Sequence, residues 1–216
     1  MKIKTRILGV ILVLALVFGT VFGDFCKFND VSDTYAGSGG TITLKASELN
    51  EGYNTVIYDP DPAKRKINVD KYELLVLDMD APLHVNECDI GCSVLVHGTD
   101  TLYIDGFVNV NGSFELGKDA AINFEKAESC IKDNSSISGT SFTCFGKISA
   151  TDNINPVICG FDEIDIEGSI SCSGLANYLI NTPGDIYMNS GSITADNSKR
   201  APIYSNNFYM CGGTIT

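Results

Sequence analysis

A short motif recurs in the second half of the chain at an almost constant interval. The copies read GKISA from Gly146, GSISC from Gly168, GSITA from Gly191 and GTIT from Gly213. The four glycines are 22, 23 and 22 residues apart. A fixed period in the twenties is typical of a solenoid, in which each repeat forms one coil that stacks on the next. The repeat therefore predicts a stacked fold before any other property is considered.

Within each repeat, apolar residues alternate with polar ones around the glycine. The segments VHGTDTLYIDGFVNV, from residue 96, and ICGFDEIDIEGSISC, from residue 158, align without a gap, so that Gly106 matches Gly168. A period of two predicts β-strands, and the glycine is expected at a bend between two of them. The same alternation predicts that Ile148, Ile170 and Ile193 point inward. Leucine-rich and helical repeats are excluded, because the Leu ladder and the long amphipathic runs that they need are missing.

These features predict an all-β chain that forms a single-stranded, right-handed parallel β-helix of about 22 residues per coil. Residues 1–23 have the layout of a secretory signal, since a basic start precedes an apolar run and a small-residue exit. Residues 24–95 are expected to form an N-terminal cap and the first irregular coils, and residues 96–216 the regular coils, with an uncapped C-terminal end. We therefore expect a secreted protein or one on the extracellular surface.

The charge and the cysteine spacing exclude several classes of partner. The chain carries a formal net charge of −12, and loss of the basic residues Lys2, Lys4 and Arg6 with the signal would lower it to −15. Nucleic acid and acidic membrane surfaces are therefore poor partners. Cys88 and Cys92 have neither the spacing nor the additional ligand pair of a zinc module, so we predict no metal, and no motif indicates a cofactor.

The recurrent GxIxx coils resemble those of the right-handed parallel β-helix surface proteins. This is a group of exported adhesin-like and carbohydrate-binding-domain proteins with a pectate-lyase-like superfold. The resemblance covers residues 96–216 clearly and residues 39–79 loosely, through GGTITL, TVIYD, INV and ELLVLDM. It implies a secreted or surface-displayed protein that catalyses nothing and binds a polysaccharide, a cell-surface glycan or another surface. A purely structural stalk or coat segment is an alternative function.

One outward position is expected to carry the residues of a binding surface. It holds Tyr103, Thr143, Asp165, Tyr187 and Tyr209 in successive recognisable repeats. A tyrosine ring can stack against a sugar, because it offers an apolar face and a polar tip. We therefore predict Tyr103, Asp165, Tyr187 and Tyr209 as ligand-binding residues. The alternative is that Tyr187 and Tyr209 only stabilise each other across neighbouring coils.

Many parallel β-helices are polysaccharide lyases or glycoside hydrolases, so a catalytic alternative is kept open. Its candidate residues are Asp59 and Asp61 in YDPDPAKRK, with Asp78 and Asp80 in LDMD. Paired carboxylates could serve as acid and base in such a reaction. The two prolines and the charges of the first segment favour a solvated turn instead, and Asp at a strand end is common in turns.

The register also bears on disulfide bonds, which the eight cysteines of an exported chain would suggest. Cys144 and Cys172 are expected to point inward, at positions too far apart to be bridged. Cys159 shares an outward register and is a better candidate. Four further candidates lie near the first coils, and the pairing stays open: Cys26, Cys88, Cys92 and Cys130.

The pentapeptide GGTIT occurs at Gly39–Thr43 and again at Gly212–Thr216. A coil that ends there would present unpaired backbone groups and the apolar interior of its last rung. We therefore expect self-association through Gly212–Thr216. Because the same five residues stand near the other end of the chain, head-to-tail stacking of copies is one possible arrangement.

Overall fold

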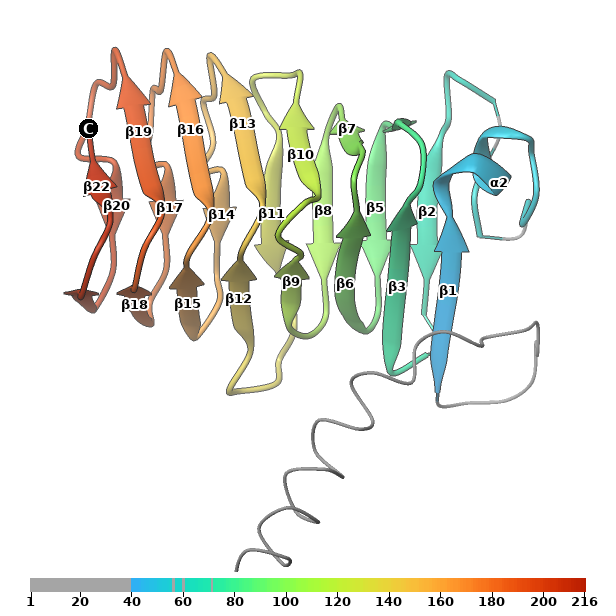
Figure 1. Cartoon of the computed structure of the whole chain (residues 1–216), viewed down its shortest axis with the longest axis horizontal. Coiled ribbons are helices and arrows are strands. Elements are labelled where there is room, and N and C mark those ends of the chain that lie inside the picture. Colours follow the sequence, from blue (N-terminus) through green and yellow to red (C-terminus); the bar gives the residue numbers. More distant parts are fainter. Residues whose placement is uncertain (1–39, 56, 60, 71) are drawn as a thin grey trace, which may run out of the picture. The chain divides into compact units, whose positions relative to one another are not determined.

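The chain folds into a parallel β-solenoid with almost no helix (Figure 1). The computed structural model describes residues 40–55, 57–59, 61–70 and 72–216, all of them within one unit of the chain. The predicted signal at residues 1–23, together with Cys26 and Gly39, lies outside the described residues. The predicted parallel β-helix is confirmed, because successive coils pair in parallel and repeat at about 22 residues.

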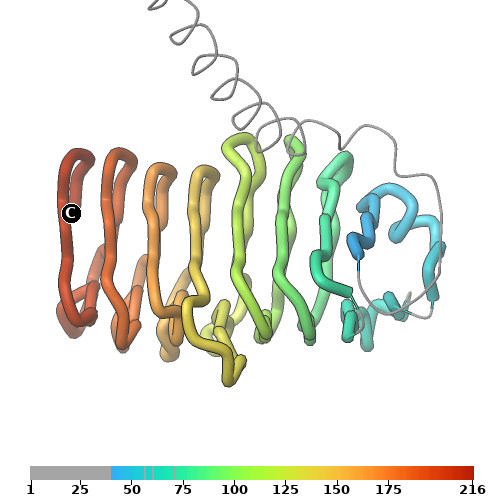
Figure 2. The backbone as a smooth tube through the Cα atoms, turned by 90° about the horizontal axis from the view of Figure 1, so that it is seen from below, coloured from blue at the N-terminus to red at the C-terminus, as the bar shows by residue number. Residues whose placement is uncertain are grey.

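Three parallel sheets run along the solenoid, and each complete coil contributes one strand to each sheet. Sheet I contains β1 (Thr41–Lys45), β3 (Leu74–Met79), β6 (Ser93–Gly98), β9 (Phe114–Leu116), β12 (Ser141–Cys144), β15 (Glu163–Ile166), β18 (Asp185–Met188) and β21 (Asn207–Met210). Sheet II contains β4 (Leu83–Val85), β7 (Thr101–Ile104), β10 (Ala121–Phe124), β13 (Lys147–Thr151), β16 (Ser169–Ser173), β19 (Ser192–Asp196) and β22 (Thr214–Ile215). Sheet III contains β2 (Lys66–Val69), β5 (Glu87–Ile90), β8 (Phe107–Val110), β11 (Cys130–Asp133), β14 (Ile158–Cys159), β17 (Ile180–Asn181) and β20 (Ile203–Tyr204). The chain passes from sheet I to sheet II to sheet III in each coil, and Figure 2 shows these coils side by side.

The first coil differs from the others because a short helix, α2 (Ala46–Asn50), stands between its two strands. Ala46 and Leu49 of this helix are buried, and α2 contacts β1, β3 and β4. It therefore lies beside the first strand of sheet II, where a further coil would otherwise pair. Complete three-stranded coils begin with β3, earlier in the chain than residue 96.

The core consists of columns of apolar side chains, one from each coil. Along sheet II the buried column contains Leu83, Leu102, Ile122, Ile148, Ile170 and Ile193. The inward orientation predicted for Ile148, Ile170 and Ile193 is thus confirmed. Inside sheet I, the rings of Phe114 and Phe142 stack at 5.4 Å between centroids.

Glycine occupies the corner between sheets I and II, as the repeat predicted. Gly146, Gly168 and Gly191 lie directly above one another, because a Cβ built on either of the last two would overlap the carbonyl oxygen of the glycine one coil before. The backbone of neighbouring coils therefore packs at this corner without side chains between.

The alignment of Gly106 with Gly168 is wrong, because it matches a strand of sheet III with a strand of sheet II. Gly106 precedes β8 of sheet III, at the corner between sheets II and III, whereas Gly168 precedes β16 of sheet II. The coils also differ in length, since Thr101, Ala121 and Lys147 share one register at intervals of 20 and 26 residues. The false match has two causes: the two glycine corners have similar sequences, and the loops between strands differ in length from coil to coil.

Candidate functional site

The predicted outward column exists in sheet I, without its first member. Thr143, Asp165, Tyr187 and Tyr209 pair in register on β12, β15, β18 and β21. Tyr103 does not belong to this column, because it lies on β7 of sheet II and pairs with His84 and Asn123. The predicted binding residues are thus divided between two faces of the solenoid.

The two tyrosines of sheet I stack on each other. The rings of Tyr187 and Tyr209 lie 5.0 Å apart between centroids, with their planes 12° from parallel. Each ring therefore offers one face to the other, and a sugar could stack only on a remaining outer face. Tyr209, on β21, has 45% of its surface exposed. This geometry favours the mutual stabilisation that was the alternative for this pair.

Acidic side chains surround the same column. Partial desolvation raises the pKa of Asp165, and the negative charges of Glu163 and Glu167 raise it further. The pKa of Tyr187 is also raised, by desolvation and then by the charges of Asp185 and Glu163. A surface of this kind repels anionic ligands.

A second outward column follows sheet II and carries Tyr103. The ring of Tyr103 stacks on that of His84, with centroids 4.3 Å apart and planes 5° from parallel. Asn123, Ser149 and Ser171 continue the column in register on β10, β13 and β16. The Ser149 hydroxyl donates a hydrogen bond to Oδ1 of Asn123 at 2.9 Å, so the amide nitrogen of Asn123 is left as a donor at the surface.

A shallow hollow of about 330 Å³ lies over this column, and we call it the sheet II groove. It runs across β7, β10, β13 and β16, which lie side by side in Figure 1. Its lining residues are Thr101, Tyr103, Ala121, Asn123, Lys147, Ile148, Ser149, Ser169 and Ser171. The groove thus combines hydroxyl, amide and ammonium groups with one aromatic ring, at intervals of about 4.8 Å along the solenoid.

Apart from Tyr103, the polar residues of the groove were missed in the sequence. AINF at residues 121–124 and KISA at residues 147–150 share the alternation of TLYI at residues 101–104. Aligning these three segments would have placed Asn123 and Ser149 beside Tyr103. The signal was hidden because their spacing is less regular than that of the glycine motif.

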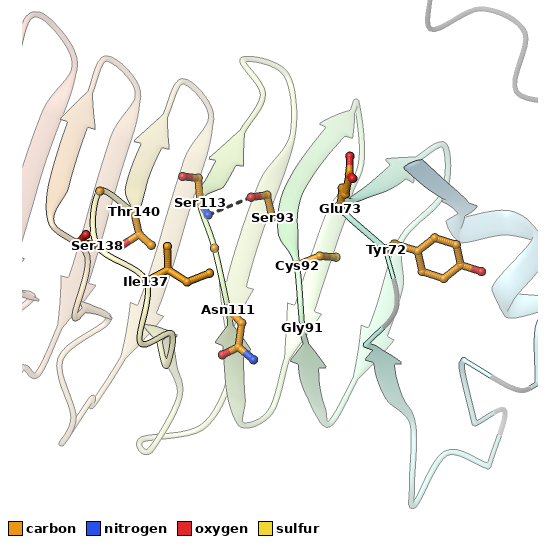
Figure 3. Close-up of a pocket in the computed structure, with 12 residues that line it drawn as sticks. Tyr72, Glu73, Gly91, Cys92, Ser93, Asn111, Ser113, Ile137, Ser138 and Thr140 are labelled. Atoms are coloured by element: carbon orange, nitrogen blue, oxygen red, sulfur yellow. Dashed lines mark hydrogen bonds between the residues drawn. The ribbon is translucent and has the colours of Figure 1, made fainter. Parts of the chain in front are cut away.

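A second hollow, of about 310 Å³, lies at the turns from sheet III to sheet I (Figure 3). Gly91 and Gly112 form part of its wall, and the backbone N–H of Ser113 donates to Oγ of Ser93 at 3.2 Å. Figure 3 shows the ring of Tyr72 pointing away from Ser93 and Ser113. The hollow therefore places no aromatic face toward a ligand, and its central hydroxyl is already bonded.

A third hollow, of about 470 Å³, lies at the corner between sheets II and III. Lys126 on its rim forms an ion pair with Asp105, with Nζ and Oδ2 3.1 Å apart. Glu87 on the same rim forms an ion pair with Lys66. Because most of these charged groups already form ion pairs, fewer of them can bind a ligand than in the sheet II groove.

The carboxylates of the catalytic alternative have local structural partners. Asp59 and Asp61 lie in the turn before β2, where each accepts a hydrogen bond of 3.0 Å from a backbone N–H two residues later. Such bonds are typical of turns in which an Asp side chain bonds to the backbone N–H two residues later. The pKa of Asp61 is lowered, first by the backbone hydrogen bond from Ala63.

Asp78 and Asp80 also contact neighbouring residues. Asp78 lies on β3 with its Oδ1 3.9 Å from Nδ1 of His97. The carboxylate of Asp80 accepts bonds from the backbone N–H of Ser47, at 2.8 Å, and from its hydroxyl, at 2.6 Å. Asp80 therefore holds the first turn of α2. Burial opposes ionisation of Asp80, but these bonds outweigh it and lower the pKa.

Within the described ranges, no group of three or more His, Cys, Asp or Glu side chains could hold a metal ion.

The chain matches no protein-family model, no curated protein and no solved structure. The fold is a parallel β-solenoid, as the resemblance implied, and membership of the adhesin-like or pectate-lyase-like group stays a prediction. No helix in the described part of the chain is long and apolar enough to cross a membrane.

Proposed function

We propose that this chain is a secreted or surface-displayed β-solenoid that binds a polysaccharide in the sheet II groove and catalyses no reaction. The observation that carries the proposal is the column of Tyr103, Asn123, Ser149 and Ser171, one side chain from each of four successive coils. Successive coils are separated by about 4.8 Å, which is close to the length of one pyranose unit. A glycan laid along the solenoid would therefore meet one polar side chain per sugar.

The chemistry of the groove favours a neutral glycan. Tyr103 offers a ring edge and a hydroxyl, and the Asn123 amide nitrogen can donate a hydrogen bond. The Ser171 hydroxyl donates to the carbonyl oxygen of Ile148 at 3.4 Å and can still accept a bond from a ligand. Lys147 contributes the only positive charge among the lining residues. The net charge of −12 repels acidic polysaccharides at longer range.

The test is affinity electrophoresis of the chain in gels that contain a panel of neutral and acidic polysaccharides. The double variant Asn123→Ala with Ser149→Ala should weaken binding to the retained polysaccharide at least about tenfold, which corresponds to about 1.4 kcal/mol. The matched control is the double variant Tyr187→Ala with Tyr209→Ala, on sheet I. If the control variant lost binding and the groove variant kept it fully, the binding site would be the sheet I column of Tyr187 and Tyr209 instead.

The same samples test the catalytic alternative. Each polysaccharide is assayed for new reducing ends and for unsaturated products after incubation with the chain. We expect none, because Asp59, Asp61 and Asp80 accept hydrogen bonds from local partners, and Asp78 has, among the described residues, only His97 as an ion-pair partner, at 3.9 Å. Turnover that disappears in an Asp78→Asn variant would establish an enzyme instead.

We also propose self-association through Gly212–Thr216. Met210 and Ile215 occupy inward positions of the last rung, yet 47% and 38% of their surfaces are exposed. At the opposite end α2 covers the start of sheet II and residues 57–59 pair with the outer edge of β2 in sheet III, so head-to-tail pairing would be confined to sheet I. Light scattering of the wild type should report a mass that rises with concentration, and Ile215→Pro should suppress the rise. A monomer at every concentration would contradict this proposal.

A further inference from the structure

Two cysteine sulfur atoms meet in sheet III. Cys130 is the first residue of β11 and Cys159 the last of β14, and their Sγ atoms lie 3.2 Å apart. Theirs is the only sulfur–sulfur contact among the cysteines that the structure describes. We propose that Cys130 and Cys159 form an intramolecular disulfide bond that links two successive coils. This inference does not depend on the proposed function.

The strands that carry the two cysteines are direct neighbours. β11 and β14 pair in parallel with their backbones about 4.8 Å apart, but the offset of two residues between Cys130 and Cys159 separates their Cα atoms by about 8 Å, slightly beyond the range of an unstrained disulfide. Cys159 pairs with Lys132, two residues after Cys130, and the bond would therefore run diagonally between the coils.

Closing the bond requires the sulfur contact to shorten and the backbone at one of the two cysteines to move toward the other. The sulfur atoms of a disulfide are about 2.05 Å apart, so the present contact must shorten by about 1 Å. β14 contains two residues, and the segment 152–157 before it contains no strand. The shift of Cys159 toward Cys130 must be taken up by this short strand, which is also hydrogen-bonded to β11 and β17.

The two thiols differ in exposure and in acidity. Cys130 is buried, with 2% of its surface exposed, whereas Cys159 is half-buried. A hydrogen bond from Cys130 lowers the pKa of Cys159, burial opposes this effect, and the nearby charge of Lys132 adds to it. The same hydrogen bond and burial raise the pKa of Cys130. Cys159 is therefore the thiol that reacts first with an oxidant from solution.

The oxidant is a low-molecular-weight disulfide, such as glutathione disulfide. The Cys159 thiolate attacks one sulfur of the oxidant, which forms a mixed disulfide and releases one thiol. Cys130 then loses its proton and attacks the sulfur of Cys159, which expels the second thiol. Two protein thiols thus lose two electrons and two protons, and one molecule of oxidant is reduced to two thiols.

The other described cysteines are placed for different outcomes. Cys88 and Cys144 are buried in the core, where burial raises the pKa of each thiol to about 12 and so suppresses the thiolate. Cys211 is exposed and could form bonds between molecules. A Cys211→Ser variant removes that competing reaction and leaves the Cys130–Cys159 pair untouched.

The experiment is peptide mapping of the full chain after incubation with glutathione disulfide and glutathione at oxidising and at reducing ratios. Free thiols are alkylated before proteolysis, and the fragments are measured by mass spectrometry with and without reduction. Under oxidising conditions we expect a linked fragment that contains Cys130 and Cys159 and that separates on reduction. We expect the same fragment in the Cys211→Ser variant.

Single Cys130→Ser and Cys159→Ser variants complete the design, because each should abolish the linked fragment and leave its partner alkylated. The wild-type map alone decides the matter if either variant fails to fold. Complete alkylation of both residues in folded protein under oxidising conditions would overturn the proposal. A predominant bond from either residue to another cysteine would overturn it as well.

Discussion

Replacing Ile170 by Ala is the perturbation that tests the core most directly. Ile170 lies on β16 with 0% of its surface exposed, between Ile148 and Ile193 on the neighbouring coils. The change removes three buried carbon atoms, which costs about 2.4 kcal/mol at about 0.8 kcal/mol for each. The parallel ladders on both sides hold the backbone in place, so the cavity cannot collapse and adds to the loss. We expect the free energy of unfolding to fall by about 3–4 kcal/mol.

The assay is urea unfolding followed by circular dichroism, in the presence of a reductant so that the cysteine pair does not vary. Ile170→Val is the conservative control and should cost about 1 kcal/mol. Asp165→Ala, at an outward position of the same coil, should change stability by less than about 0.5 kcal/mol. Amide hydrogen exchange locates the loss, which should be largest in β16 and its two neighbours, because coils of a solenoid interact mainly with adjacent coils. A loss at Ile170 no larger than that at Asp165 would falsify the assigned orientation of these side chains.

Three further predictions concern a corner, a carboxylate and a thiol. Gly168→Ala should destabilise the fold by about 1–3 kcal/mol, because its Cβ would overlap the Gly146 carbonyl oxygen, and urea unfolding measures this. Asp80→Asn should lose about 0.5 kcal/mol at neutral pH, because Asn keeps an acceptor for the Ser47 bonds and solvent screens the lost charge. Its difference from the wild type should shrink as the pH falls from 3.8 through the lowered pKa of Asp80, because this stabilisation is complete only above 3.8; unfolding curves from neutral pH to below 3.8 test this. Stability should also fall between pH 9.0 and about 12, where the unfolded chain releases the Cys88 proton and the folded chain retains it, and the fall should be shallower in Cys88→Ala.

The sequence was sufficient for the fold because the features that define it are repeated. The corner glycine and the inward Ile170 recur with every coil, so a single error of alignment does not erase them. The helix α2 was not predicted, because its five residues, ASELN, are too few to show a helical period. Its stability comes from the burial of Leu49 and from the bonds that Asp80 accepts, and both depend on the tertiary fold.

The sites were less predictable than the fold, because they depend on which strands are neighbours in each sheet. Tyr103 was assigned to the column of Tyr187, since the corner before β8 resembles the corner before β16 in sequence. Coil lengths vary with the loops outside the core, and periodicity does not determine those loops. The cysteines show the same limit, because Cys130 and Cys159 could be selected as candidates but paired only once β11 and β14 were known to be neighbours.

The proposed disulfide and the proposed groove involve the same two coils. Asn123 lies on β10 and Ser149 on β13, and the strands that follow them in sheet III are β11 and β14, which carry Cys130 and Cys159. A covalent bond between β11 and β14 would therefore fix the spacing of the two rungs that present Asn123 and Ser149. Rigid spacing lowers the entropy that the groove loses when it binds an extended chain. If both proposals hold, reduction of the disulfide should weaken polysaccharide binding in the wild type and leave binding by the Cys130→Ser variant unchanged. Equal affinity of oxidised and reduced wild type would show that the two features are independent.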